Sequence, residues 1–293
     1  MGIALLKQSF QDWITQQWVI LFGKKIIRDQ NEWLLGPFGK TKGIGQKFIE
    51  QLAISEDLEI DKSESEKGLI QSINQLNLSQ QELESLSKRV IDFYEKTSEY
   101  ELDLKVKWNP FFKIFGGLLK ILFSNRIEQL NLPIGNSKNS DGLNSELINL
   151  VDKKTKELKR TVWLRTFKKS EQVVYSGVYE TCTLPKGKTC IKAIFPLPNG
   201  NATVILSPSV GKNGELILKS SGEKNGDSGF YFLLNDSKGN LWTKYIRSFK
   251  DTLIVKSENN SMMAKQTLTL WNLKVVEFKY NIKKVTYNKI YKQ

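Results

Sequence analysis

The chain has 293 residues, including 44 Lys or Arg, 31 Asp or Glu, two Cys and no His, and its formal net charge is +13. Without imidazole, Ser-His-Asp and Cys-His catalysis and His-ligated zinc or haem are excluded. Two thiols cannot complete a four-Cys zinc site within one chain, so we expect neither a metal nor a cofactor.

The first residues are expected to form a helix. Apolar side chains recur at three- and four-residue spacing over residues 4–22, which predicts a helix that packs on the core or lies on a membrane surface. Ser9 and Asp12 resemble a capping pair, which would start the helix at residue 10 instead.

Two further helical regions are expected before residue 100. Residues 44–54 place apolar side chains on one side of a helix, and residues 69–98 read as one or two helices. Ser79 followed by Glu82 is a capping-box pattern and marks a helix start within the second region.

The segment 108–124 (WNPFFKIFGGLLKILFS) is strongly apolar, but it is too short and too charged to cross a bilayer. We expect a helix that is either buried in the core or placed on a membrane surface. In the second case its candidate contact residues are Trp108, Phe111, Phe112, Lys113 and Lys120, with the aromatic rings in the headgroup region and the lysines snorkelling.

Residues 133–145 are rich in Gly, Asn and Ser and separate two regions of different character. We therefore divide the chain into a helical domain over 1–135, a linker and connecting helix over 136–159, and an antiparallel β domain over 160–293.

From residue 160 onward the hydrophobic period is two, and turn residues recur every 8–12 positions. The expected strands are 160–168, 172–180, 189–195, 202–207, 214–220, 229–234, 240–248, 252–257, 265–271, 273–281 and 284–290. The predicted fold class is α+β, with a helical N-terminal half and an antiparallel all-β half of about ten strands that forms a barrel or a sandwich.

Cys182 and Cys190 flank one of the predicted hairpin turns. They are interpreted as two reduced thiols, a cross-strand redox pair or half of a metal site. Because the first residues do not resemble a signal peptide, we expect a cytoplasmic protein with a possible association with membranes.

The net positive charge comes entirely from the second half, since residues 1–150 carry a net charge of −2 and residues 151–293 carry +15. This excess suits an anionic partner, either a membrane surface or nucleic acid. Nucleic acid is disfavoured because only six of the 44 basic residues are Arg, the residue that base and phosphate recognition prefer.

The leading functional hypothesis is a non-catalytic binding protein that holds a hydrophobic or amphipathic ligand, such as a lipid, in the β domain. Its candidate ligand-binding residues are Tyr231, Trp242, Tyr245, Trp271 and Phe278. The alternatives are a nucleic-acid-binding protein and an enzyme without His. For the enzyme, the candidate groups in a β cavity are Glu180, Glu215, Asp227, Tyr231, Lys244 and Glu277.

Overall fold

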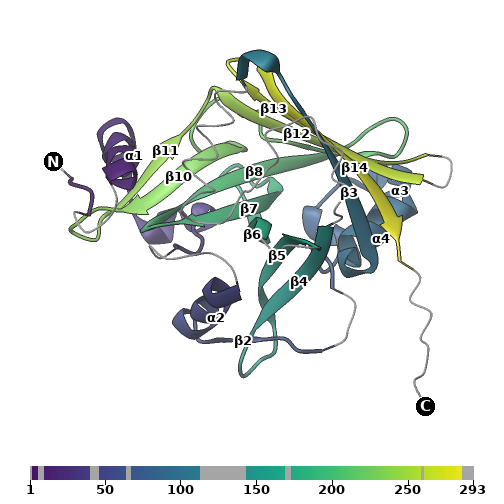
Figure 1. The fold of residues 1–293 in the computed structure, drawn as a ribbon, viewed down its shortest axis with the longest axis horizontal. Helices are drawn as coiled ribbons and strands as arrows, with labels where there is room; N and C mark the ends of the chain where they lie inside the picture. The colour runs from purple at the N-terminus through teal and green to yellow at the C-terminus, as the bar shows by residue number, and fades with distance from the viewer. Residues whose placement is uncertain are drawn as a thin grey trace.

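The computed structural model describes residues 2–5, 10–39, 46–63, 67–112, 143–168, 173–258 and 261–285. In this part of the chain, 14 antiparallel strands form one sheet that does not close into a barrel (Figure 1). Its main path runs β2-β4-β5-β6-β7-β8-β9-β12-β13-β14-β3, and β10, β11 and β1 extend it from β8.

The strands are β1 (Lys24–Ile26), β2 (Leu58–Ile60), β3 (Tyr100–Trp108), β4 (Leu143–Asp152), β5 (Leu158–Phe167), β6 (Val173–Thr183), β7 (Thr189–Leu197), β8 (Gly200–Val210), β9 (Leu216–Lys219), β10 (Gly229–Asn235), β11 (Leu241–Tyr245), β12 (Phe249–Glu258), β13 (Ser261–Leu270) and β14 (Leu273–Lys284). The α-helices are α1 (Phe10–Phe22), α2 (Gln46–Ser55), α3 (Gln80–Ser85) and α4 (Lys88–Glu95). The 3-10 turns are η1 (Arg28–Gln30), η2 (Glu32–Leu34), η3 (Ile73–Leu76), η4 (Thr97–Glu99) and η5 (Pro110–Phe112).

The antiparallel β character of the second half is confirmed. The ten expected ranges from 160–168 to 273–281 correspond in order to β5–β14. The last expected strand, 284–290, falls almost wholly outside the described residues, and β14 ends at Lys284.

The helical character of the first half is only partly right, because three of its segments are strands of the same sheet. β1 pairs with β11, β2 with β4, and β3 with β14. The fold is therefore mostly antiparallel sheet with few helices, and the expected barrel is not confirmed.

The connecting helix expected within 136–159 is wrong. Residues 143–152 form β4, which pairs with β2 on one side and β5 on the other. Apolar side chains of β4 serve both faces of the sheet, since Leu147 joins one buried cluster and Leu150 another. This two-sided burial obscures the period-two signal. The domain limits themselves stay a prediction.

Local signals at helix starts are confirmed where the structure describes them. Residues 4 and 5 are not helical and α1 is described from Phe10, whereas Ser9, the expected cap, lies outside the described residues. The Ser79 side chain accepts a hydrogen bond from the Glu82 backbone N–H, and the Glu82 carboxylate accepts one from the Ser79 backbone N–H, which completes the capping box of α3.

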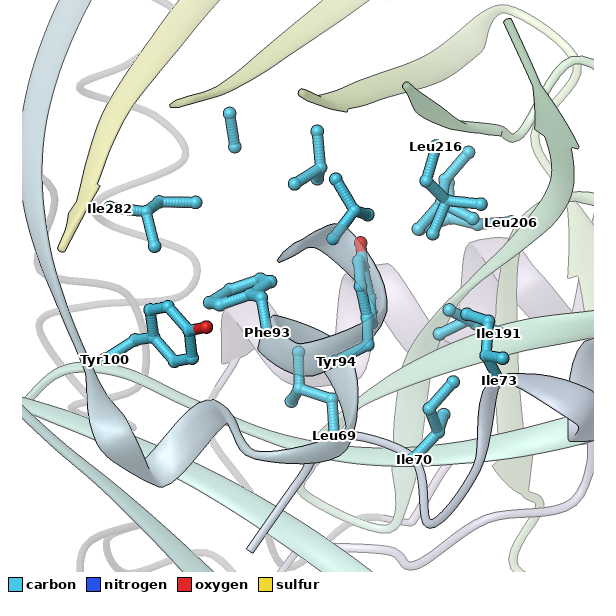
Figure 2. Close-up of a cluster of buried hydrophobic side chains, with 14 of the residues drawn as sticks. Leu69, Ile70, Ile73, Phe93, Tyr94, Tyr100, Ile191, Leu206, Leu216 and Ile282 are labelled. Atoms are coloured by element: carbon cyan, nitrogen blue, oxygen red, sulfur yellow. The ribbon is translucent and has the colours of Figure 1, made fainter. Parts of the chain in front are cut away.

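The sheet curls around residues 67–99, which we call the plug segment and which contain η3, α3, α4 and η4. Its apolar side chains share one cluster with β3 and β4, which belong to opposite ends of the sheet path, and with the strands between them. Figure 2 shows Phe93 and Tyr94 of α4 between Ile282 of β14 on one side and Leu206 and Leu216 on the other. The face around the plug segment is therefore the inner face of the sheet.

The outer face is covered by other N-terminal segments. Helix α2 packs Phe48, Ile49 and Leu52 against β4–β7. Residues 28–39 pack Leu34 against β7, β8, β10 and β11 in a separate cluster. Both sides of the sheet are thus buried around β6–β8, which explains the nearly continuous apolar sequence there.

Strand β8 connects two wings of the sheet, one formed by β2 and β4–β7 and the other by β9, β12–β14 and β3. Residues 200–206 pair with β7, and residues 207–210 pair with β9. The first part also pairs with β10 on its other edge. One continuous strand therefore belongs to both wings.

Candidate functional site

A cavity of about 110 Å³ lies between α4 and the inner face of the sheet. Phe93 and Tyr94 line it from the helix, and alternate residues of β3, β5–β9 and β12–β14 line it from the sheet. Most of these side chains are aliphatic or aromatic. Strand alternation thus places one residue in two from distant parts of the chain around the same space.

Polar groups gather at one end of this cavity. We call the set Trp163, Arg165, Asp251, Gln266 and Tyr280 the polar end. The guanidinium carbon of Arg165 lies 3.7 Å from the ring centroid of Trp163 and 5.3 Å from that of Tyr280. Stacking of this kind holds the Arg165 side chain in one orientation.

Hydrogen bonds connect three other members of the polar end. The Gln266 amide nitrogen donates to Asp251 Oδ2 at 2.7 Å. The Tyr280 hydroxyl donates to Gln266 Oε1 at 3.5 Å, at the limit of a hydrogen bond. The second Asp251 oxygen, Oδ1, is buried and has no hydrogen-bond partner among the described residues.

Burial controls the ionisation of this site. Asp251 is 4% exposed, and burial raises its pKa to about 7, with the Gln266 hydrogen bond opposing the shift. Burial also raises the pKa of Tyr280, and the neighbouring Arg165 opposes it. Near neutral pH the Asp251 carboxyl is therefore partly protonated and can donate a hydrogen bond from within an apolar wall.

Beyond the polar end, the inner face continues as a row of half-buried aromatic rings towards α1. The ring centroids of Phe249 and Phe230 are 5.0 Å apart, those of Phe230 and Phe232 are 5.2 Å apart, and those of Phe232 and Trp18 are 6.4 Å apart. On β12, Phe249 precedes Asp251 by two residues, so the two face the same side. The row therefore joins the polar end to α1.

The five expected ligand-binding residues do not line this cavity. Tyr231 is on the outer face, where its ring packs on Tyr245 at 5.0 Å and its hydroxyl donates to the Asp227 carbonyl. Trp242 donates to Asp236, Trp271 is exposed at the turn after β13, and Phe278 is in another buried cluster. The structure does not bring the five together, and their role in binding stays a prediction.

The five expected membrane-surface residues are also separated by the structure. Trp108 is 4% exposed and ends β3 inside a buried cluster, so the strand alternation takes it away from the surface. Phe112 is half-buried and packs on that cluster, whereas Phe111 is 92% exposed. Lys113 and Lys120 lie outside the described residues.

The groups proposed for an enzyme lie on different elements and have local partners. Glu180 pairs with Arg160 and with buried Lys192, whose ammonium also donates to the Trp33 and Leu35 carbonyls at 3.1 and 2.6 Å. This cluster anchors residues 28–39 on the outer face. Asp227 forms an ion pair with Lys186, and Glu277 forms ion pairs with Lys265, Lys274 and Lys279. The Glu215 carboxylate accepts a hydrogen bond from the Asn213 backbone N–H, and the Lys244 ammonium donates one to the Phe22 carbonyl.

Cys182 and Cys190 face each other across the β6–β7 ladder, and both thiols are free and buried. Burial raises the pKa of Cys182 to about 12 and that of Cys190 to about 11. At neutral pH both are therefore unreactive thiols. Among the described residues, no group of three His, Cys, Asp or Glu is arranged to hold a metal ion.

Sequence reasoning did not select the polar end. A signal was present on β12, where Asp251 alternates with Leu253 and Val255 and thus puts a carboxylate on an apolar face. Arg165 similarly follows Trp163 by two residues on β5. What the sequence does not show is that these two strands, far apart in the chain, face the same cavity.

Comparison with known proteins identifies a distant relative. No known protein family and no solved structure matches the chain. It is 26% identical over 249 residues to the "Uncharacterized membrane protein YndJ" of Bacillus subtilis (strain 168), an alignment that covers 84% of this chain and 42% of that protein. The chain thus spans less than half the length of this relative. None of the described helices has the length and apolar character needed to cross a bilayer.

Proposed function

We propose that the protein is a non-catalytic binding protein that holds a hydrophobic or amphipathic ligand between α4 and the inner face of the sheet. The observation that carries this proposal is the cavity of about 110 Å³ with apolar walls and polar groups at one end. Small-molecule sites typically combine an apolar lining with a few convergent polar groups.

The geometry favours a ligand with a compact apolar body and one polar head. Engineered apolar cavities of about 150 Å³ hold a benzene molecule, so a ring or short alkyl group suits the present volume. The head would meet the unpaired oxygen of Asp251 and the Arg165 guanidinium stacked on Trp163. A longer acyl chain would extend along the aromatic row towards α1.

Native mass spectrometry of the purified full chain, followed by organic extraction, tests the proposal. We expect a bound small molecule, or uptake of 4-ethylphenol or oleic acid as probes. Failure of the protein to carry or take up any of them would contradict ligand binding at this site.

A pair of neighbouring substitutions on β13 locates the site. Ala264 lines the cavity, whereas Met263 points to the other face and is exposed. Ala264→Leu fills the space and is expected to reduce binding at least about tenfold, because the added carbons occupy the ligand volume. Met263→Leu is the matched control and should bind like the wild type.

We also propose that the protein works at a membrane surface. The relative's printed name calls that protein a membrane protein, and the alignment covers 84% of the present chain. The enzyme and nucleic-acid hypotheses stay predictions, and no geometry described above favours either over ligand binding.

A further inference from the structure

Helix α1 carries an exposed apolar stripe along its whole length. Phe10 is 74% exposed and Phe22 is 62% exposed, and Ile14, Trp18 and Leu21 lie between them at helical spacing. Single exposed apolar residues are ordinary, but a continuous row on one helix marks an interaction surface.

The stripe is not the face by which α1 joins the core. The helix buries Val19 and Ile20 against Leu234 of β10 and the ring of Trp242 on β11. In Figure 1, α1 lies next to β10 and β11, at the end of the molecule far from α3 and α4. The helix is therefore anchored on one side. Trp18 lies at the boundary, against Phe232, and the rest of the stripe is left exposed by the described residues.

Basic groups surround the C-terminal end of this stripe. Lys24, Lys25 and Arg28 follow the helix directly and are exposed, and Asp12 is the one acidic residue between Phe10 and Arg28. Lys244 adds a fourth cation, with its ammonium 5.9 Å from the Trp18 ring centroid and donating to the Phe22 carbonyl at 2.6 Å. Large apolar side chains next to lysines are typical of helices that lie in the headgroup layer of anionic membranes.

We propose that α1 is the membrane-docking face, with its apolar stripe inserted into an anionic phospholipid bilayer and with Lys25 and Lys244, which share the α1 side of the sheet, facing lipid phosphates. This inference rests on the proposed membrane location but does not depend on the cavity ligand. The aromatic row from Trp18 to Phe249 then leads from the bilayer to the polar end. A membrane amphiphile is the class of ligand that such a placement would deliver.

Sedimentation of the full chain with lipid vesicles tests the docking face. We expect binding to vesicles of equal parts phosphatidylcholine and phosphatidylglycerol, and weaker binding to phosphatidylcholine alone. The triple substitution Phe10→Ser, Ile14→Ser and Phe22→Ser should reduce the partition coefficient at least about tenfold, because three inserted apolar side chains are lost. Lys25→Gln should reduce binding about fivefold on the anionic vesicles only, and Lys24→Gln, on the opposite face of β1, is its matched control.

Exposed apolar residues elsewhere provide matched controls. Ile54 on α2 is 79% exposed, and Phe111 is still more exposed. Ile54→Ser and Phe111→Ser should bind vesicles like the wild type. A second measurement uses the folded wild type, so unfolding of a variant cannot explain its result. Brominated lipids should quench the tryptophan fluorescence of the wild type, and Trp18→Phe should remove most of that quenching.

Three outcomes would overturn the inference and can be told apart. If the wild type binds vesicles and the α1 triple variant binds equally well, the membrane location stands and the docking face is elsewhere, with Phe111→Ser reporting on the rival surface. If the wild type binds neither kind of vesicle, both the anionic-membrane location and the docking face fail, while the mass-spectrometry result on the cavity is unaffected. If the wild type is instead a dimer that the triple variant makes monomeric, the stripe joins two copies of this chain.

Discussion

At the scale of single residues, the decisive feature is a carboxyl group in an apolar wall. Asp251 is buried beside one hydrogen-bond donor, Gln266, and its other oxygen is unpaired among the described residues. A buried ionised group with so few partners is costly, which is why its pKa is raised to about 7. Strongly shifted pKa values of this kind are common at ligand-binding and catalytic sites.

Asp251→Asn is expected to change how stability depends on pH. The folded-state pKa of about 7 exceeds the ordinary value of 3.8, so between these values the folded protein holds a proton that the unfolded chain has lost. The free energy of unfolding therefore falls as pH rises from about 4 to about 7, by up to about 4 kcal/mol. The Asn variant lacks this loss, so its Tm should exceed that of the wild type at pH 8 and match it near pH 4.5.

Thermal unfolding followed by circular dichroism at several pH values provides the measurement. The chain contains no His, so no imidazole titrates between pH 5 and 8 and obscures the effect of Asp251 on stability. Asp103→Asn is the control, because it makes the same chemical change at a side chain that is mostly exposed. A pH-independent difference for Asp251→Asn would mean that the carboxyl is not desolvated.

At the scale of elements, strand β3 carries a clear strand signal in its sequence. Its residues alternate without exception between buried apolar and exposed charged side chains. That pattern is the signature of a half-buried strand, but its position between helical segments suggested a helical domain. The strands of the second half could be predicted because alternation and turn residues recur together, whereas β1 and β2 are three residues long and carry almost no periodic signal.

A pair of substitutions in β3 tests whether this strand is a structural part of the sheet. Val106 is buried opposite Phe278, and Val106→Asp should lower the free energy of unfolding by about 3 kcal/mol or more because it buries an unpaired carboxylate. Lys105 is exposed opposite Lys279, and Lys105→Asp replaces a like-charge pair by an opposite-charge pair. Urea unfolding should show no loss of stability for the second change, within about 0.5 kcal/mol. Equal effects of both changes would contradict the assigned alternation.

At the scale of the whole molecule, the first 112 residues supply parts of both faces of one sheet. The plug segment fills the inner face, α2 and residues 28–39 cover the outer face, and β3 covers the edge of β14. The candidate cavity also needs both halves, because Phe93 and Tyr94 line it together with Trp163 and Tyr280. Sequence patterns could assign strands, but they could not show which distant strands share a face, and the site depends on that arrangement.

Expression of fragments tests the predicted division into domains. Residues 143–293 alone should aggregate, because they would expose the apolar inner face, and coexpression with residues 1–112 should yield a soluble complex that size-exclusion chromatography can isolate. The opposite result, a monodisperse fragment 160–293 that unfolds cooperatively, would support the separate β domain expected from the sequence.

The continuity of β8 has a mechanical consequence. This strand is hydrogen-bonded into both wings, so separating the wings at β8 would break backbone hydrogen bonds along its length. On the opposite side of the curl, β3 and β4 come close together, but no ladder of the described residues joins them. Any widening of the sheet would therefore take place between β3 and β4, where no described backbone hydrogen bonds between the two strands have to break.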